Sequence, residues 1–493
     1  MSSHPAYPAP LRADELLSLS PIPTLLERTR AELSAEFKPG RPIRVSRSPG
    51  RLDVMGGIAD YTGSLVCEGT LDRAAAVALQ ERDDRQVQVF SFNLLDEHAP
   101  FTVSMPLEAL AKHSIDTLRK EFTDPGRRWA GYLAGCLFAL HERKLVDLLS
   151  PSVKGLNLAL YSTVPLGAGV SSSAAIEVAT MMNLLDHFGI RDKVDPMIVA
   201  EMCQHVENDV VGAPCGIMDQ ASSCAGEAGS LMRMICQPHE LQKPLFLPKG
   251  IRVIGINSNV KHSVGGGMYG RTRCAAFMAH KMIHEIMRQM GVKAGQTMTA
   301  DPLGGYLANL EPEDYKKFFR PYLPEYIKGG EFLLKFGGTF DTATKVEPDV
   351  NYHVQHAADH HVLESRRVRN FVEFLTDAAA LPIGSKERDT LLNKAGHLMY
   401  ASHISYTEEA MLGADECDLL VKLVREREHA GLYGAKITGG GSGGTVAVLA
   451  NEGEQVDRAI DEIMKLYEEQ TGRKPEAFLG SSPGAWAAGT AVV

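Results

Sequence analysis

A glycine- and serine-rich segment at residues 164–179, VPLGAGVSSSAAIEVA, most constrains how this chain can fold. The apolar run GLNLALYS precedes it and predicts a strand. Apolar residues at helical spacing follow it and predict a buried amphipathic helix that starts at Ser173. Between the two, Gly167 and Gly169 allow the backbone to turn its amide groups toward an anion. The strand, loop and helix together predict a rigid cradle for a phosphate group.

Two common phosphate-binding motifs do not fit this segment. No Gly-Lys-Ser or Gly-Lys-Thr follows the glycines, which excludes a P-loop, and the glycine spacing is not that of a dinucleotide-binding turn. Ser171, Ser172 and Ser173 supply hydroxyl groups and an N-cap for the helix. Taken alone, the loop is also compatible with a structural turn that binds no ligand, so the choice between these two interpretations depends on the other motifs of the chain.

Length and charge narrow the class of protein. A chain of 493 residues exceeds one average core and predicts two α/β domains, which we place at residues 1–245 and 246–493. The net charge of -10 offers no general basic surface, so we expect small-molecule substrates and neither nucleic acid nor a membrane as partner. The first residues lack the features of a signal peptide, and we expect a cytoplasmic protein.

Local patterns give the order of elements. They predict a helix over residues 13–37, a strand at IRVSRSPGRLDVM, and helices over 196–211, 354–378 and 386–400. Residues 285–350 are rich in Gly, Pro and aromatic residues and predict an insertion or a lid-like excursion. Eight cysteines without a C-x-x-C pair predict reduced, mostly buried thiols. Four histidines could bind a metal but are more typical of a solvated helix face: His353, His356, His360 and His361.

Three glycine-marked segments now stand together: PGRLDVMGGIADYTG, the serine loop and ITGGGSGGTVAV. With PCGIMDQ, SNVKHS and LMYASHIS they make six motifs whose order resembles that of the GHMP small-molecule kinases, and within them galactokinase relatives. The resemblance covers the chain from about Arg44 onward. It implies a ribosomal S5-like N-terminal domain, a ferredoxin-like C-terminal domain and an active site in the cleft between them.

The resemblance also implies a chemistry, the transfer of the γ-phosphoryl group of ATP to a sugar hydroxyl with the help of Mg²⁺. Asp219 matches the catalytic aspartate of the family, and Arg51 matches the arginine beside it. Without the motifs, a structural ion pair at a domain seam is the alternative. Glu207 and Ser173, or Ser172 in place of Ser173, match the magnesium ligands; without the family match, Glu207 is more typical of a solvated helix glutamate.

By the same resemblance, further residues bind the two substrates. The sugar-binding positions are Asp60, Gly57, Ile58, Tyr61, Gly216 and Tyr269. The ATP-binding positions are Gly167, Ala168, Gly169, Val170, Ser171, Ser172, Ser173 and Trp129, the last of which could instead be a core tryptophan.

One motif departs from the galactokinase pattern. Galactokinases have Gly-Glu-His-Thr-Asp-Tyr where this chain has Gly56, Gly57, Ile58, Ala59, Asp60 and Tyr61. The glutamate serves the sugar 6-hydroxyl in that family, so its loss predicts a substrate without the hydroxymethyl group, L-arabinopyranose. The segment and the insertion also resemble the kinase portion of plant-type L-arabinokinases. Galactokinase activity and a non-catalytic sugar and ATP sensor remain the alternatives, and Asp53, where galactokinases have Asn, has no explanation at this stage.

Overall fold

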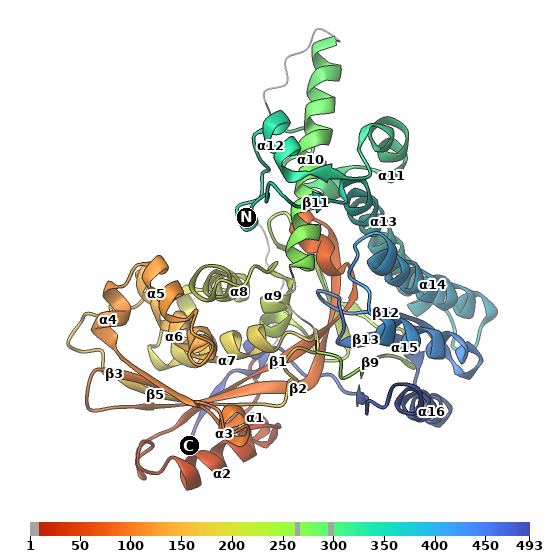
Figure 1. Cartoon of the computed structure of the whole chain (residues 1–493). Helices are drawn as coiled ribbons and strands as arrows, with labels where there is room; N and C mark the ends of the chain where they lie inside the picture. The colour runs from red at the N-terminus through yellow and green to blue at the C-terminus, as the bar shows by residue number, and fades with distance from the viewer. Residues whose placement is uncertain (1–8, 262–266, 294–299) are drawn as a thin grey trace.

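The computed structural model describes residues 9–261, 267–293 and 300–493, which form two sheets with helices packed against them (Figure 1). The larger sheet has the order β15-β1-β2-β5-β3-β4, and β6 pairs with β2, β7 and β8. Its strands are β1 (Arg44–Met55), β2 (Leu65–Glu81), β3 (Gln86–Ser91), β4 (Thr102–Pro106), β5 (Leu156–Ser162), β6 (Ser230–Ile235), β7 (Glu240–Leu241), β8 (Leu245–Phe246) and β15 (Thr490–Val492).

Helices cover both faces of this sheet because its central strands are buried on both sides. One face carries α6 (Arg128–Glu142), α7 (Ser172–His187), α8 (Pro196–His205) and α9 (Met218–Ala225). The other face carries α1 (Ala13–Ser18) and α2 (Ile22–Glu32). Three short helices lie along the rim, α3 (Phe92–Asp96), α4 (Leu107–Lys112) and α5 (Ile115–Glu121), and α17 (Ala485–Ala488) contacts β1.

The smaller sheet is antiparallel, in the order β12-β13-β9-β14. Its strands are β9 (Ile251–Asn257), β12 (Leu432–Ile437), β13 (Thr445–Asn451) and β14 (Glu476–Phe478). Helices separate β9 from β12, and α16 (Glu454–Thr471) separates β13 from β14, which is the β-α-β-β-α-β pattern of a ferredoxin-like fold. The long helices between β9 and β12 are α10 (Met268–Lys293), α13 (Val354–Ala379), α14 (Lys386–Glu408) and α15 (Asp415–Arg425).

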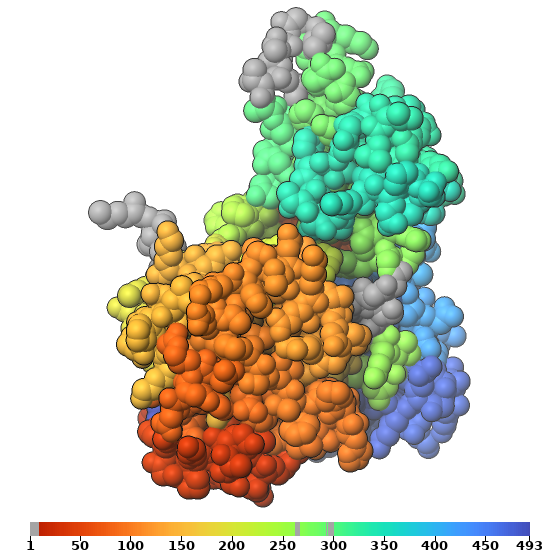
Figure 2. Space-filling model, turned by 60° about the vertical axis from the view of Figure 1, so that its left-hand side comes forward, coloured from red at the N-terminus to blue at the C-terminus, as the bar shows by residue number. Residues whose placement is uncertain are grey.

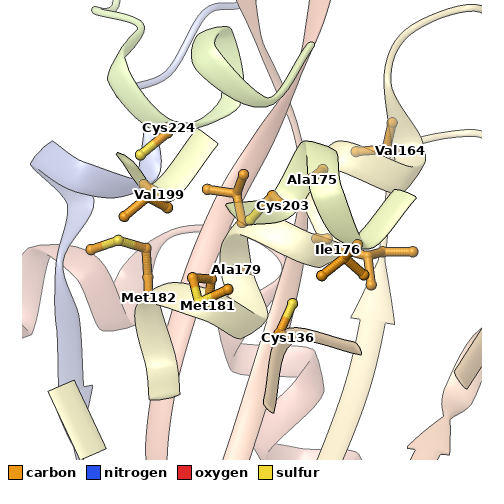
Figure 3. Close-up of a cluster of buried hydrophobic side chains, with 14 of the residues drawn as sticks. Cys136, Val164, Ala175, Ile176, Ala179, Met181, Met182, Val199, Cys203 and Cys224 are labelled. Carbon is orange, nitrogen blue, oxygen red and sulfur yellow. The ribbon is translucent and has the colours of Figure 1, made fainter. Parts of the chain in front are cut away.

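A cluster of small, sulfur-containing and aliphatic side chains lies beneath the start of α7 (Figure 3). Ala175, Ala179 and Met182 of α7 contribute to it, together with Cys136 and Cys203 from α6 and α8. All eight cysteines are free and seven of them are buried, as predicted. Because this packing holds α7 rigidly, the loop before the helix has a fixed base.

The insertion forms a separate projection above the N-terminal half of the molecule (Figure 2). It contains α11 (Pro312–Asp314), β10 (Ile327–Lys328), α12 (Gly329–Phe336) and β11 (Asn351–Tyr352). Its apolar side chains form a cluster of their own with α10 and α13. The predicted insertion is therefore an ordered unit that continues from α10 and returns to α13.

Several expectations need adjustment. The helix predicted over residues 13–37 is two helices, because Pro21 cannot continue a helix; α2 starts directly after it and holds Pro23 in its first turn, where a helix tolerates proline. The helix predicted over 196–211 changes at Val206 into a π-helix, η3 (Val206–Val211). The last strand, β15, returns to β1 in the larger sheet, so the chain end does not stay with the smaller sheet. The split at residues 245 and 246 stays a prediction.

The expected solvated face at the histidine cluster is wrong for two members. His360 and His361 are fully buried and contact Ser405 and Tyr61. Within the described ranges, no group of three or more His, Cys, Asp or Glu residues could hold a metal ion. In the same ranges, no helix is long and apolar enough to cross a membrane.

Candidate active site

The three glycine-marked motifs meet at one place. The loop before α7, residues 163–171, packs against the glycine-rich turn between β12 and β13 and against β1. Thr445 Oγ1 donates a hydrogen bond of 2.8 Å to the Ala168 carbonyl, and the Arg51 backbone N–H donates one of 3.1 Å to the Val170 carbonyl. A Cβ atom on Gly444 would lie 2.5 Å from the Ala168 oxygen, so this turn tolerates only glycine there.

The serines of this phosphate-loop candidate carry unused hydrogen-bonding groups. Ser171 has a φ of 59°, and its hydroxyl makes no N-cap hydrogen bond to α7, contrary to the expectation that a serine caps this helix. Within the described part of the chain, the buried hydroxyls of Ser171 and Ser172 have no partner. Because an unpaired buried polar group costs about 1–3 kcal/mol, a bound polar ligand would relieve this cost. The N-terminal end of α7 favours an anionic ligand.

Arg51 and Asp219 form a close ion pair beside this loop. Both Nε and Nη2 of Arg51 donate to Asp219 Oδ1, at 2.9 and 2.7 Å. Nη1 donates to the Gly169 carbonyl at 2.7 Å, so the same side chain touches the phosphate loop. Burial alone would lower the pKa of Arg51, but the charge of Asp219 opposes this effect and the pKa is raised. Arg51 is 3% exposed and Asp219 is 20% exposed, which leaves the carboxylate as the accessible partner.

Asp60 lies directly against the motif that carries Asp219. It belongs to the short 3₁₀ helix η1 (Gly57–Thr62), and a Cβ atom on Gly216 would lie 1.4 Å from Asp60 Oδ2. Only glycine at position 216 therefore leaves room for the Asp60 carboxylate. Burial, followed by the negative charge of Asp219, raises the pKa of Asp60 to about 7. Asp60, the candidate sugar-binding carboxylate, therefore lies in the same site as the candidate catalytic pair of Arg51 and Asp219.

Aromatic side chains border Asp60. The rings of Tyr61 and Tyr269 meet edge to face, with centroids 6.1 Å apart. The Tyr61 hydroxyl lies 3.0 Å from His361 Nε2, while His361 Nδ1 lies 2.7 Å from the Ala357 carbonyl. Burial lowers the pKa of His361 to about 4, so the ring is neutral at pH 7. The neutral ring donates to Ala357 through Nδ1–H and accepts from Tyr61, which fixes the tyrosine.

Gly57 and Ile58 lie at the other end of η1. A Cβ atom on Gly57 would lie 1.7 Å from the Tyr406 hydroxyl, so no side chain fits at this position. The Tyr406 hydroxyl accepts from the Ile58 N–H at 3.0 Å and donates to the Gly439 carbonyl at 2.9 Å. Ile58 is 1% exposed and packs with Ile254 and Tyr406 in the core beside the smaller sheet. The side chain of Ile58, which was predicted to contact the sugar, is therefore part of that core.

The predicted magnesium ligands lie next to the loop. Glu207, in the π-helix η3, accepts a 2.7 Å hydrogen bond from Gln220 Nε2, and Gln220 also donates to Glu177. Burial raises the pKa of Glu207 to about 7, and a hydrogen bond with Ser173 opposes this shift. Glu207 is 7% exposed, which excludes the alternative of a solvated helix glutamate.

Two further predicted features are Trp129 and the SNVKHS motif. Trp129 is half-buried at the start of α6, where its Nε1–H donates to the Gly126 carbonyl at 3.1 Å and its ring packs on the main apolar cluster. His262 and Ser263 of the SNVKHS motif lie outside the described residues.

Sequence reasoning missed three buried polar residues around the site, Glu68, Tyr406 and Lys436. Glu68 lies opposite Asp53 in the β1–β2 register and 3.3 Å from Arg51 Nε. Lys436 Nζ lies 2.6 Å from Asp53 Oδ2, and both side chains are fully buried. The available signal was a charged residue inside an otherwise apolar strand, as in LVCEGTL and YGAKI.

Comparisons with known proteins identify relatives of this chain. The family models for the GHMP kinases N terminal domain and GHMP kinases C terminal match residues 132–227 and 389–469. The L-arabinokinase of Arabidopsis thaliana is 34% identical over 93% of this chain; the match spans 47% of that protein, about half its length. The galactokinase of Chloroflexus aggregans is 30% identical over 88% of this chain and 90% of its own length.

The fold has a counterpart among solved structures. The galactokinase of Lactococcus lactis, solved in complex with galactose, superposes with a TM-score of 0.68 over 95% of this chain and 98% of its own, at 19% identity. The galactokinase of Chloroflexus aggregans and the two family models identify the protein family of this chain. The superposition on the solved galactokinase shows that the fold is the same. The chain belongs to the GHMP kinases and, within them, to the galactokinase-like sugar kinases.

Proposed function

We propose that this protein is an ATP-dependent sugar 1-kinase that phosphorylates the anomeric hydroxyl of L-arabinose, giving L-arabinose 1-phosphate and ADP. The observation that carries the proposal is the Arg51–Asp219 pair, which lies against the phosphate loop on one side and next to Asp60 on the other. Phosphoryl transfer requires a positioned phosphate chain and a positioned acceptor hydroxyl, and this arrangement supplies groups for both.

The reaction uses these residues as follows. Asp60 accepts hydrogen bonds from sugar hydroxyls, and Tyr269 borders the ring. The anomeric oxygen attacks the γ-phosphorus, the bond from that phosphorus to the β–γ bridging oxygen breaks, and ADP leaves. Asp219 receives the hydroxyl proton, while the Arg51 guanidinium, held by Asp219 and the Gly169 carbonyl, stabilises negative charge on the transferring group.

The residues near the loop fit a magnesium ion. The Glu207 carboxylate and the Ser173 hydroxyl form an oxygen donor set, which Mg²⁺ prefers, and nucleotide phosphates and water would complete six-fold coordination. When bound, the ion would neutralise phosphate charge. Ser171 and Ser172, whose buried hydroxyls are unpaired, would donate hydrogen bonds to the phosphates.

The proposed preference for L-arabinose depends on the side chains that lie next to Gly57. The Tyr406 hydroxyl occupies the space that a side chain at this position would need, and it is already engaged with Ile58 N–H and Gly439 O. The carboxylate next to Gly57 is that of Asp53, which is fully buried and already bonded to Lys436 Nζ and the Gly57 N–H, so it is not free to pair with a sugar hydroxymethyl group. A hydroxyl that loses water without gaining a partner weakens binding, so a sugar without that group is favoured. The relative named L-arabinokinase supports the same choice.

D-Galactose is the second candidate substrate, because the galactokinase of Chloroflexus aggregans matches this chain over nearly the full length of both proteins. A non-catalytic sugar and ATP sensor is disfavoured because the Arg51–Asp219 pair and the unpaired serine hydroxyls are retained.

Release of ADP distinguishes these possibilities. The purified protein is assayed with ATP and MgCl₂ against L-arabinose, D-galactose, D-galacturonate, D-glucuronate and no sugar. We expect the highest kcat/KM with L-arabinose. A higher value with D-galactose would overturn the substrate and leave the kinase, whereas no turnover with any sugar would favour the sensor.

A further inference from the structure

The insertion reaches the sugar-binding turn through a buried ion pair. Asp341, in the insertion, accepts hydrogen bonds from Nε and Nη2 of Arg273 on α10, at 2.9 and 2.8 Å. The side chains of Asp341 and Arg273 are 3% and 9% exposed. A bidentate pair of this kind fixes both the position and the plane of the guanidinium group.

Arg273 in turn contacts the residues that we assign to the sugar. Its guanidinium carbon lies 5.0 Å from the centre of the Tyr61 ring and 5.7 Å from that of Phe277. Its positive charge acts on Asp60, where it opposes the increase in pKa caused by burial. Its Nη1 is buried and has no hydrogen-bond partner among the described residues.

Two more contacts connect the insertion to the end of η1. The Tyr306 side chain lies so close to Gly63 that a Cβ atom there would meet its ring at 2.5 Å. Asn309 and Gln237 exchange hydrogen bonds through their side-chain amides, and Gln237 Nε2 donates to the Gly63 carbonyl at 2.8 Å. The η1 turn is therefore held from the insertion side at both Tyr61 and Gly63.

We propose that the insertion is part of the sugar site and that Asp341 is a positioning residue, which holds Arg273 over Tyr61 so that its charge faces Asp60. Without Asp341, the guanidinium group loses its only hydrogen-bond partner among the described residues and is free to leave the Tyr61 ring. The turn then loses the cation that favours an ionised Asp60. This inference rests on the proposed role of Asp60 and Tyr61 in sugar binding.

A second bidentate ion pair of the insertion, with a more exposed arginine, allows the positioning role to be separated from simple attachment of the insertion. Arg320, also in the insertion, makes a bidentate pair with Asp359 of α13, at 2.8 Å for both Nε–Oδ1 and Nη2–Oδ2. This pair docks the insertion onto the body of the protein without a hydrogen bond to η1. Arg320→Gln therefore weakens the attachment, while Asp341→Asn, which keeps the size of the side chain, weakens the hold on Arg273.

The first test is a steady-state comparison with whichever sugar the wild type phosphorylates best. For Asp341→Asn we expect the KM for sugar to rise about tenfold, with kcat and the KM for ATP within about twofold. For Arg320→Gln we expect no change in any of the three. An equal rise in both variants, or an unchanged KM for sugar in Asp341→Asn, would overturn the proposal.

The second test does not depend on turnover. Hydrogen–deuterium exchange of the peptide that contains residues 57–63 reports the order of η1 directly. We expect faster exchange in Asp341→Asn than in wild type and in Arg320→Gln. If η1 exchanges at the wild-type rate in Asp341→Asn, the proposal is wrong even if the protein is a sugar kinase; if exchange is faster but no sugar is phosphorylated, the proposed function fails and the hold on η1 stands.

Discussion

The carboxylate of Asp53 and the ammonium group of Lys436 form a fully buried ion pair that joins β1 of the larger sheet to β12 of the smaller one. Asp53 also accepts hydrogen bonds from the backbone N–H groups of Gly57 and Gly439, at 2.9 and 3.3 Å. One side chain thus connects the η1 turn with the glycine-rich turn between β12 and β13. This explains why an acidic residue stands at position 53, which the sequence alone left unexplained.

We expect Asp53→Asn to destabilise the protein by about 3 kcal/mol or more, because it leaves the Lys436 charge buried without a counter-ion. The double variant Asp53→Asn with Lys436→Met removes both charges and should recover much of the loss. Thermal unfolding of the single and double variants measures both effects. Equal melting temperatures for the two variants would show that the unpaired charge of Lys436 is not the cause of the lost stability.

Asp219→Asn tests the assignment of the proton acceptor. The amide keeps the size of the side chain but accepts a proton poorly, so we expect kcat to fall by about 100-fold or more. Because Asp219 is not expected to hold the ground-state substrates, the KM values should stay within about threefold. Rapid-quench measurement of phosphoryl transfer, with calorimetric titration of sugar and nucleotide, separates chemistry from binding. Unchanged turnover would remove Asp219 from the mechanism.

The pKa of Asp60 predicts how sugar binding depends on pH. Burial and the charges of Asp219 and Asp53 raise this pKa to about 7, against the opposing effects of Arg273 and the Tyr61 N–H. Only the ionised carboxylate accepts hydrogen bonds from the sugar with both oxygens. Affinity for sugar should therefore be full above pH 7 and should decline below it, approaching tenfold per pH unit.

Glu207 has a pKa raised to a similar value, so the measurement must separate the two carboxyls. Glu207 lies by the phosphate loop, and its protonation is expected to act on the KM for ATP, whereas Asp60 acts on the KM for sugar. Initial rates from pH 5.5 to 8.5 at varied sugar and fixed saturating ATP report Asp60 alone. A KM for sugar that is flat across this range would contradict the role of Asp60.

The local motifs were predictable because short-range rules govern them. The strand–loop–helix unit around Gly167 and Gly169 follows from backbone freedom and helical spacing, and β5 and α7 begin within one residue of the expected positions. What the sequence could not supply is the pairing of distant residues. Lys436 lies 383 residues from Asp53, and the hydroxyl of Tyr406 occupies the space beside Gly57 only because α14 packs there. The burial of His360 and His361 likewise depends on neighbours from α14 and η1.

Glu68 provides a last test, because its carboxyl is fully buried beside Arg51 and neither oxygen has a hydrogen-bond partner within the described residues. Burial, followed by the charge of Asp53, raises the pKa of Glu68 well above its ordinary value, so the folded protein binds this proton more tightly than the unfolded chain does. The resulting destabilisation is absent below the unfolded pKa, about 4.5, and grows as the pH rises above it.

Glu68→Gln keeps the shape of the side chain and removes this ionisation. We therefore expect the melting temperature at pH 8 to rise by about 2 °C or more, with little change at pH 4.5 and with kcat within about threefold of wild type. Thermal scans at the two pH values measure the difference. If the variant is instead less stable at pH 8 and slow in phosphoryl transfer, Glu68 is ionised and acts with Asp219 as a second counter-ion that Arg51 requires.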